Sequence, residues 1–369
     1  MRNYLDFEKE IKNLEEDLET SKNPFDKEGI SEVDTNKIQK IQKEINEKLD
    51  KTYSSLNSWQ KTMVARHEDR PRANFYIKEI FSDFTLLSGD RLFADDKSVI
   101  AGFGFIDNKS VLVIGQEKGE DLNSRMEHNF GMMKPEGYRK CIRLMKIADR
   151  FGIPVISLID TPGAYPGIGA EQRGQALAIA SSIECCMSLK VPNISVIIGE
   201  GGSGGAIALA SSNKVIMLEH SIYSVISPEG CASILWRDPS KSLEAADAMK
   251  LTAKELLKMN IVDEVIQEPL GGAHRDGSEM AKEIKNSILK NLENFDGMTR
   301  DQIFNQRKTR FLKIGRDRGF KRPSDTLGEE LAYKESTISK ITRIINQRKI
   351  LALSITSVLV LSILLSIFL

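Results

Sequence analysis

Two glycine-rich loops, each directly after an apolar run typical of a buried strand, constrain this chain most. The first belongs to residues 155–170, VISLIDTPGAYPGIGA, and the second to residues 194–206, ISVIIGEGGSGGA. A predicted helix follows each loop, from about Glu171 in the first case and over 207–212 in the second. Glycines let the backbone turn and leave N–H groups without a Cβ in front of them. At a helix N-terminus such groups stabilise negative charge, so both loops are candidate anion-binding sites.

The loops lie in a middle region where short β-branched runs alternate with helical segments. Residues 151–210 carry only 6 charged side chains and hold 10 of the 26 glycines. The segment 136–150 predicts an amphipathic helix that ends before Gly152 and Pro154. Alternating helices and nearly uncharged strands predict an α/β domain around a parallel sheet covered on both faces. The predicted strands are 99–105, 110–114, 155–159, 194–198, 214–218 and 262–266.

The N-terminal segment has a different composition, with 23 charged side chains in residues 1–50. Its apolar residues recur at helical spacing in two runs, Ile11, Leu14 and Leu18, and then Ile38, Ile41, Ile45 and Leu49. This spacing predicts two amphipathic helices, broken at Pro24 and Gly29. A free-standing coiled coil would need more heptads, so we expect an arm that packs on its own chain or on a partner.

Residues 350–369 form an apolar run of 20 residues without a charge. As a helix this run would reach about 30 Å, the thickness of a bilayer core. The basic residues before it would keep the body of the protein on the cytoplasmic side. A single membrane span, docking on a partner and an extension without function are all open. The basic residues are Lys340, Arg343, Arg348 and Lys349.

Composition excludes several other classes of protein. The chain has 52 Lys+Arg and 52 Asp+Glu, a formal net charge of +0, so nucleic acid is not an expected partner. Its 4 cysteines show no CxxC spacing, which argues against a zinc site, a redox site or a disulfide scaffold. The first ten residues already contain five charges, unlike a signal peptide, and we expect a reducing compartment.

Nucleotide binding is one use of the second loop. A phosphate-binding P-loop is disfavoured, because Gly205 stands where its Lys is needed. The stretch from Gly199 to Gly204 satisfies GxGxxG after a strand, and Glu219 lies where a ribose-binding acid would sit. An NAD-dependent Rossmann oxidoreductase is therefore an alternative. Against it, the βαβ unit is shorter than the roughly 30 residues that the motif expects.

Acyl chemistry is another use of the same loop. The backbone N–H groups of Gly204 and Gly205 could form an oxyanion hole, in which each donor typically contributes about 10²–10³ in rate. Ser203 fits GxSxG formally, but a hydrolase triad also needs an acid and a histidine, and nothing in the sequence marks His220 or His274 for that role. Tight packing of the helix on the strand is the purely structural alternative.

Longer strings carry a resemblance to a known family. They are GMMKPEGYRK (131–140), IDTPGAYPGIGAEQRGQA (159–176), IGEGGSGGAIALA (198–210), YSVISPEGCASILW (223–236) and EPLGGAHR (268–275), with YLDFEKEI and SWQKTMVARHEDRP (58–71) nearer the N-terminus. Over residues 4–317 the chain resembles the alpha subunits of bacterial-type acetyl-coenzyme A carboxylase carboxyl transferases. The part from about Lys321 onward has no counterpart in the family pattern.

The resemblance implies an α/β fold of the crotonase-like (ClpP/crotonase) class, with stacked ββα units and an N-terminal helical arm. With it, we expect an arm (1–71), a crotonase-like CoA carboxyltransferase domain (72–320), a basic and polar linker (321–349) and an apolar tail (350–369). The expected location is the cytoplasm, with the tail as a candidate tether to the inner face of a membrane.

The resemblance also implies an activity. With a beta subunit, in an α₂β₂ transferase, such a chain moves a carboxyl group from carboxybiotin on the biotin carboxyl carrier protein to acetyl-CoA. The product is malonyl-CoA, in the first committed step of fatty-acid biosynthesis. Biotin carboxylase supplies carboxybiotin with ATP, and zinc is expected on the beta subunit, with no metal in this chain. The reaction places negative charge on oxygens, which backbone donors can hold without a side-chain acid.

By motif, the oxyanion hole is expected on the backbone of Gly204 and Gly205, facing biotin, while the beta subunit supplies most of the CoA site. A non-catalytic scaffold, with the arm and tail as its working parts, is a further hypothesis. The expected substrate-binding residues are Gly201, Gly202, Gly163 and Ala164.

Overall fold

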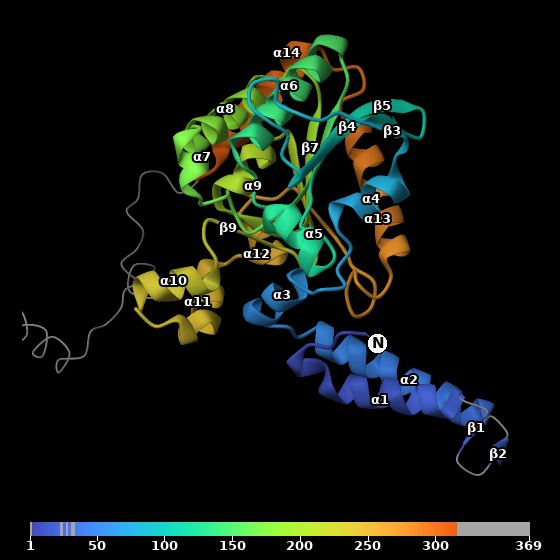
Figure 1. Ribbon diagram of the computed structural model, residues 1–369. Helices are drawn as coiled ribbons and strands as arrows, with labels where there is room; N and C mark the ends of the chain where they lie inside the picture. Colours follow the sequence, from blue (N-terminus) through green and yellow to red (C-terminus); the bar gives the residue numbers. More distant parts are fainter. Residues whose placement is uncertain (1, 23–24, 27–28, 31–33, 316–369) are drawn as a thin grey trace, which may run out of the picture.

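The computed structural model describes residues 2–22, 25–26, 29–30 and 34–315. They form an α/β body around an eight-stranded sheet, and an arm of two helices extends from it (Figure 1). Within this described part, no helix is long and apolar enough to cross a membrane. The expected linker (321–349) and tail (350–369) lie outside the described residues.

The sheet of the body adds its strands in chain order. Its order is β10-β8-β7-β6-β5-β4-β3, and β9 pairs with the end of β7. The pairs from β5 to β10 are parallel, but β3, β4 and β5 pair antiparallel, so the prediction of a parallel sheet is wrong for this part. The strands are β3 (Ser82–Leu86), β4 (Val99–Ile106), β5 (Lys109–Gln116), β6 (Val155–Thr161), β7 (Asn193–Gly202), β8 (Lys214–Leu218), β9 (Ile222–Ser224) and β10 (Glu264–Ile266).

The antiparallel part has a local cause. Only Asp107 and Asn108 join β4 to β5, with Ile106 paired to Lys109 across the turn. Asp107 has a positive φ of 49°, as tight hairpin turns require. Parallel neighbours need a crossover of a dozen or more residues, for which this connection is far too short.

Helices cover both faces of the sheet, as predicted. One face packs on α6, α8, α9 and α12, with Leu144, Cys186 and Leu209 in its core. The other packs on α4 and α13, with Tyr76 and Ile284 in its core. The helices of the body are α3 (Ser58–Ala65), α4 (Ala73–Ile80), α5 (Leu122–Glu127), α6 (Pro135–Phe151), α7 (Ile168–Gln172), α8 (Gln175–Ser188), α9 (Ser203–Ala210), α10 (Pro228–Leu235), α11 (Ser242–Met249), α12 (Ala253–Lys258), α13 (Gly277–Glu293) and α14 (Arg300–Lys313).

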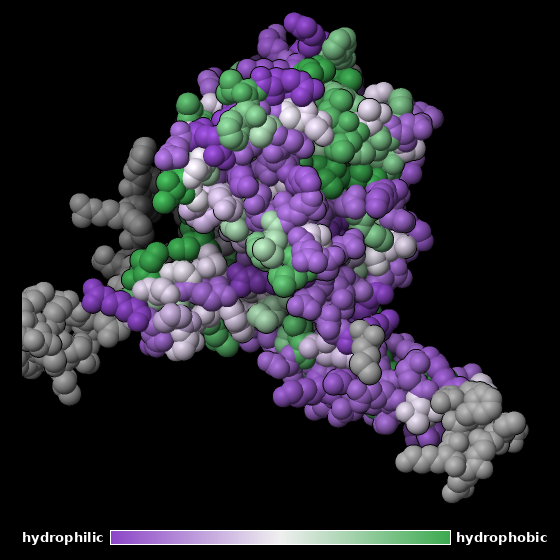
Figure 2. Space-filling model, viewed as in Figure 1, coloured by the Kyte–Doolittle hydropathy of each residue, from purple (hydrophilic) through white to green (hydrophobic). Residues whose placement is uncertain are grey.

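The arm consists of the two predicted amphipathic helices, α1 (Lys9–Lys22) and α2 (Thr35–Tyr53). A short antiparallel pair, β1 (Phe25–Asp26) and β2 (Gly29–Ile30), lies between them. The apolar faces of the helices pack together, while the outer surface is hydrophilic (Figure 2). The shared core of the arm contains Ile11, Leu18, Ile45, Leu49 and Tyr53.

Buried polar contacts hold the arm on the body. Arg275, which precedes α13, pairs with Glu15 at 2.6 Å and with Glu8 at 3.3 Å. Within the arm itself, the hydroxyl of Tyr53 donates a hydrogen bond to the same Glu8 at 2.9 Å. These contacts fix the base of the arm to the end of the sheet where the strands carry the glycine loops.

Candidate active site

The two glycine loops meet at the carboxyl edge of the sheet. Strands β6 and β7 are parallel neighbours, so the loops after Thr161 and Gly202 leave the sheet on the same side. Both helices begin earlier than predicted, α7 at Ile168 and α9 at Ser203. The second loop is therefore only a turn, and its glycines belong to the end of β7 and the first turn of α9.

The loops touch through their backbones. A Cβ on Gly202 would lie 2.2 Å from the carbonyl oxygen of Pro162. A Cβ on Gly205 would lie 2.6 Å from the carbonyl carbon of Gly163 and 3.1 Å from the nitrogen of Ala164. Side chains do not approach this closely, so glycine is required at both positions. The structure thus brings together four of the residues that the sequence singles out.

The other two glycines of the second loop have different surroundings. A Cβ on Gly204 would lie 3.5 Å from the side chain of Ile179, an ordinary contact. A Cβ on Gly201 would lie 3.0 Å from the ring of Tyr223 and 3.2 Å from Ile197. Gly204 is therefore the position in this loop where a small side chain fits without displacing the backbone.

The N-terminus of α9 presents backbone N–H groups. Gly202 is the N-cap, and no side chain caps the helix. The first-turn N–H groups, including those of Gly204 and Gly205, have no partner within the helix, and the helix dipole adds to their positive character. Gln116 fixes this turn, because its Nε2 donates to the carbonyl of Gly205 at 2.8 Å.

The first loop is braced internally. The N–H of Gly163 donates to Oγ1 of Thr161 at 3.1 Å, and that hydroxyl donates to the carbonyl of Gly163 at 2.7 Å. The N–H of Gly163 is thus engaged, and the loop contributes its shape and its close contact with α9.

A buried cluster of charges, which the sequence did not predict, lies at the carboxyl ends of β5, β6 and β7. Nζ of Lys118 lies 2.7 Å from Asp160 and 3.2 Å from Glu200. Arg72 pairs with Asp160 at 3.2 Å, and Arg66 pairs with Glu200 at 2.7 Å. Asp160, Glu200 and Lys118 each stand within two residues of the carboxyl end of a buried strand, but nothing in the sequence pairs them with one another.

The cations keep both carboxylates ionised. Burial alone would raise the pKa of Asp160, but Lys118 and Arg72 outweigh it and hold that pKa below its usual value. The pKa of Glu200 is likewise lowered, against the effect of burial, by Lys118 and Arg66. The carboxyl edge thus carries fixed, mutually balanced charges below uncapped N–H groups.

The geometry does not support a serine hydrolase. The His220 ring packs edge-on against Tyr53, with ring centroids 5.5 Å apart, and His274 stacks on His67 at 3.9 Å. Within the described ranges neither histidine is hydrogen-bonded to Ser203. The same residues also contain no group of three or more His, Cys, Asp or Glu side chains placed to hold a metal ion.

The Rossmann alternative does not fit the topology. Dinucleotides bind in such folds where the strand order reverses, whereas here the order from β3 to β8 and on to β10 follows the chain, with only the short β9 off this path. Glu219, the candidate ribose-binding acid, accepts a hydrogen bond from the backbone N–H of Glu268 at 3.3 Å. The glycines of the GxGxxG string are therefore explained by the close contacts of the second glycine loop with its neighbours, and not by dinucleotide binding.

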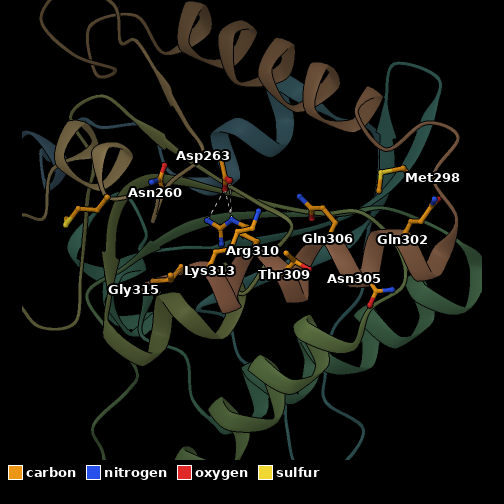
Figure 3. Close-up of a pocket in the computed structure, with 12 residues that line it drawn as sticks. Asn260, Asp263, Met298, Gln302, Asn305, Gln306, Thr309, Arg310, Lys313 and Gly315 are labelled. Carbon is orange, nitrogen blue, oxygen red and sulfur yellow. Dashed lines mark hydrogen bonds and ion pairs between the residues drawn. The ribbon is translucent and has the colours of Figure 1, made fainter. Parts of the chain in front are cut away.

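A separate cavity of about 660 Å³ lies along α14 (Figure 3). Its wall includes Arg310, which forms an ion pair with Asp263 at 2.9 Å. Asp263 accepts a hydrogen bond from Val215 at the start of β8, so the cavity lies at the amino edge of the sheet. None of its lining residues belongs to the glycine loops.

Comparison of the chain with models of known protein families decides which family it belongs to. Residues 4–315 match the model described as acetyl co-enzyme A carboxylase carboxyltransferase-like. The chain belongs to this family. The family resemblance inferred from the sequence is confirmed, and so is the α/β class with an N-terminal helical arm. The oxidoreductase alternative is wrong.

Individual members of the family are similar over most of the chain. The acetyl-coenzyme A carboxylase carboxyl transferase subunit alpha of Pelagibacter ubique (strain HTCC1062) is 62% identical over 339 residues, 92% of each chain. That of Azorhizobium caulinodans is 52% identical over 319 residues, 86% of this chain and 99% of the relative. Among solved structures, transcarboxylase 12S has a TM-score of 0.49 at 19% identity, covering 60% of this chain and 41% of that chain.

The first of these relatives corrects one expectation. A match of 339 residues must extend beyond residue 321, wherever in this chain it starts. Part of the segment after Lys321 therefore has a counterpart in the Pelagibacter protein, and the expectation that it has none is wrong for this relative.

Proposed function

We propose that this chain is the alpha subunit of the carboxyltransferase of an acetyl-CoA carboxylase, and that it acts with a beta subunit to make malonyl-CoA. Family membership over residues 4–315 supports the activity. The observation that carries the site is the uncapped N-terminus of α9, where Gly205 packs on the backbone of Gly163 too closely to admit a Cβ.

The chemistry needs donors of this kind. Carboxybiotin, on its carrier protein, supplies the carboxyl group. Overall, a C–C bond forms at the acetyl methyl carbon, the N–C bond to the carboxyl group breaks, and the methyl proton replaces that group on nitrogen. Gly204 and Gly205 donate their N–H groups to the oxygen on the biotin side where negative charge develops as the carboxyl group leaves. Gly201, Gly202, Gly163 and Ala164 shape the space around that oxygen.

The residues present fit this role. Gly204 and Gly205 have no side chains that would block the approach to their N–H groups. The charges of Asp160 and Glu200 are neutralised by the cations paired with them, so these carboxylates do not repel an anion. We assign the CoA site mainly to the beta subunit, with zinc there and none here, and the assembly to α₂β₂ with biotin carboxylase and its carrier protein. The division into an arm (1–71) and a carboxyltransferase domain (72–320) is part of the same proposal.

Reconstitution tests this function. The chain alone is expected to form no malonyl-CoA from acetyl-CoA and carboxylated biotin carrier. Addition of a beta subunit is expected to produce malonyl-CoA in proportion to the complex formed. A complex that assembles and stays inactive would contradict the proposal and favour a non-catalytic scaffold.

A further inference from the structure

The buried charge cluster links the two glycine loops across three strands. Lys118 follows β5, Asp160 lies in β6 and Glu200 lies in β7. The Asp160 side chain is 1% exposed and that of Glu200 is 8% exposed. Lys118, 12% exposed, contacts both carboxylates. A single ammonium group therefore joins the ends of the two strands that carry the loops.

Asp160 replaces part of the β ladder. Ile159 pairs with Ile197, and the next pair is Thr161 with Gly201, so two additional residues of β7 fall between them. In this gap the backbone N–H of Glu200 donates to Oδ1 of Asp160 at 2.9 Å. The carboxylate thus takes the place of a ladder acceptor where β7 changes register on its way to α9.

The backbone of β7 is pressed against this carboxylate. A Cβ on Gly199 would lie 2.6 Å from Oδ1 of Asp160. The same oxygen accepts from Lys118 at 2.7 Å, and the other oxygen pairs with Arg72 at 3.2 Å. A buried carboxylate deprived of its cation becomes costly and takes up a proton more readily. Removing the Lys118 charge should therefore disturb the point at which β7 turns toward Gly204.

We propose that Lys118 is a positioning residue: through Asp160 it fixes the register shift of β7 and so aims the N–H groups of Gly204 and Gly205. This inference rests on the proposed function of that glycine pair. In this role Lys118 acts through its contacts with Asp160 and Glu200. The other charged groups around Asp160 are Arg70 and Arg72 before α4, Glu117 after β5 and Glu200 on β7.

The test compares Lys118→Met with Lys118→Arg in the reconstituted carboxyltransferase. We expect kcat of the Met variant to fall about 10–100-fold, the cost of a misplaced catalytic group, with KM for acetyl-CoA within about twofold. We also expect the acidic limb of its kcat profile to move to higher pH, because Asp160 has lost its main cation. The Arg variant keeps the charge and is expected to recover most of the activity.

Lys190→Met is the matched control, because Lys190 pairs with Asp301 at 2.8 Å on the surface. It should leave kcat and the pH profile unchanged. A folded Lys118→Met variant with wild-type kcat and an unshifted acidic limb overturns the inference. A Lys118→Arg variant whose kcat falls as much as that of the Met variant also overturns the inference.

Two Asp160 variants decide the matter if Lys118→Met does not fold. Asp160→Asn keeps an oxygen for the N–H of Glu200 but loses the ion pair with Lys118, so both it and Asp160→Ala should lose kcat about 10–100-fold. Wild-type kcat in either folded variant overturns the inference. Gly204→Pro in the same assay separates the two proposals. Full activity of Gly204→Pro would contradict the function proposed for the glycine pair. If Gly204→Pro loses activity and Lys118→Met has wild-type activity, only the role proposed for Lys118 is contradicted.

Discussion

Single glycines in the second loop differ in what they tolerate, and this predicts different outcomes for the same substitution. Gly205→Ala places a Cβ 2.6 Å from the carbonyl carbon of Gly163, so one loop must move. We expect kcat of the reconstituted enzyme to fall at least about tenfold, since misplacement by about 1 Å can cost 10²-fold. Steady-state kinetics with circular dichroism of the purified variant measures this.

Gly204→Ala is the matched control. Its Cβ meets Ile179 at 3.5 Å, a normal contact, and the backbone N–H stays in place. We expect kcat within about threefold of the parent, because the change removes no donor. Equal kcat values in the two alanine variants would show that the close contact with Gly163 does not position the loop.

The stacked histidines predict a pH dependence of stability. Burial, then the proximity of His67, Arg70 and Arg275, lowers the pKa of His274 to about 3. Its pKa in the unfolded chain is about 6.5, so below that pH the unfolded state binds more protons and stability falls as pH drops toward 3. His274→Phe keeps a ring on His67 without this titration. We expect it to reduce the loss of unfolding free energy between pH 7 and 5 by about 1–2 kcal/mol.

Urea denaturation at both pH values measures this difference. His128→Gln is the control, because His128 lies on the separate segment after α5 and outside the stack. It should keep the parental pH dependence. An unchanged pH dependence in His274→Phe would mean that the stack does not oppose protonation.

Among the elements, the arm should be stable through its own core. Ile45, 1% exposed, packs between α1 and α2. We expect Ile45→Ala to cost about 2–4 kcal/mol of unfolding free energy, typical of a buried truncation, with kcat unchanged. Lys43→Ala, on the exposed side of α2, should cost less than about 0.5 kcal/mol. If Ile45→Ala also cost less than about 0.5 kcal/mol, this would contradict packing of the two helices on each other.

Elements with strong local patterns could be predicted from the sequence. Helix α6 begins at Pro135, ends before Gly152 and follows the expected 136–150 closely, because its periodicity and its C-cap are local signals. Strands β3 and β9 were missed. The first is mostly exposed and the second has three residues, so neither has the apolar run that marked the buried strands.

The candidate site could be predicted only where it is local. The glycine loops are continuous in sequence, and the structure places Gly202 and Gly205 against 162–164. The cluster beneath them joins Lys118 to Glu200 across 82 positions, and nothing in the sequence pairs such distant charges. The roles of the glycines themselves stay predictions.

At the scale of the whole molecule, the strands of the sheet are arranged in the order in which they occur in the chain. Two successive strand–loop–helix units therefore lie side by side. The carboxyl ends of β5, β6 and β7 form one edge, with the charge cluster within it and α9 beginning above it. Buried contacts from the arm reach the same end of the body. We therefore expect the backbone, rather than a side chain, to be the donor of the site.

The most direct measurement removes the backbone donor at Gly204. Gly204→Pro deletes this N–H in the first turn of α9, and Gly204→Ala retains it while adding a side chain. In the reconstituted carboxyltransferase, we expect the Pro variant to lose about 10²–10³ in kcat and the Ala variant to stay within about threefold of the parent. A folded Pro variant with the kcat of the Ala variant would contradict an oxyanion hole at the N-terminus of α9.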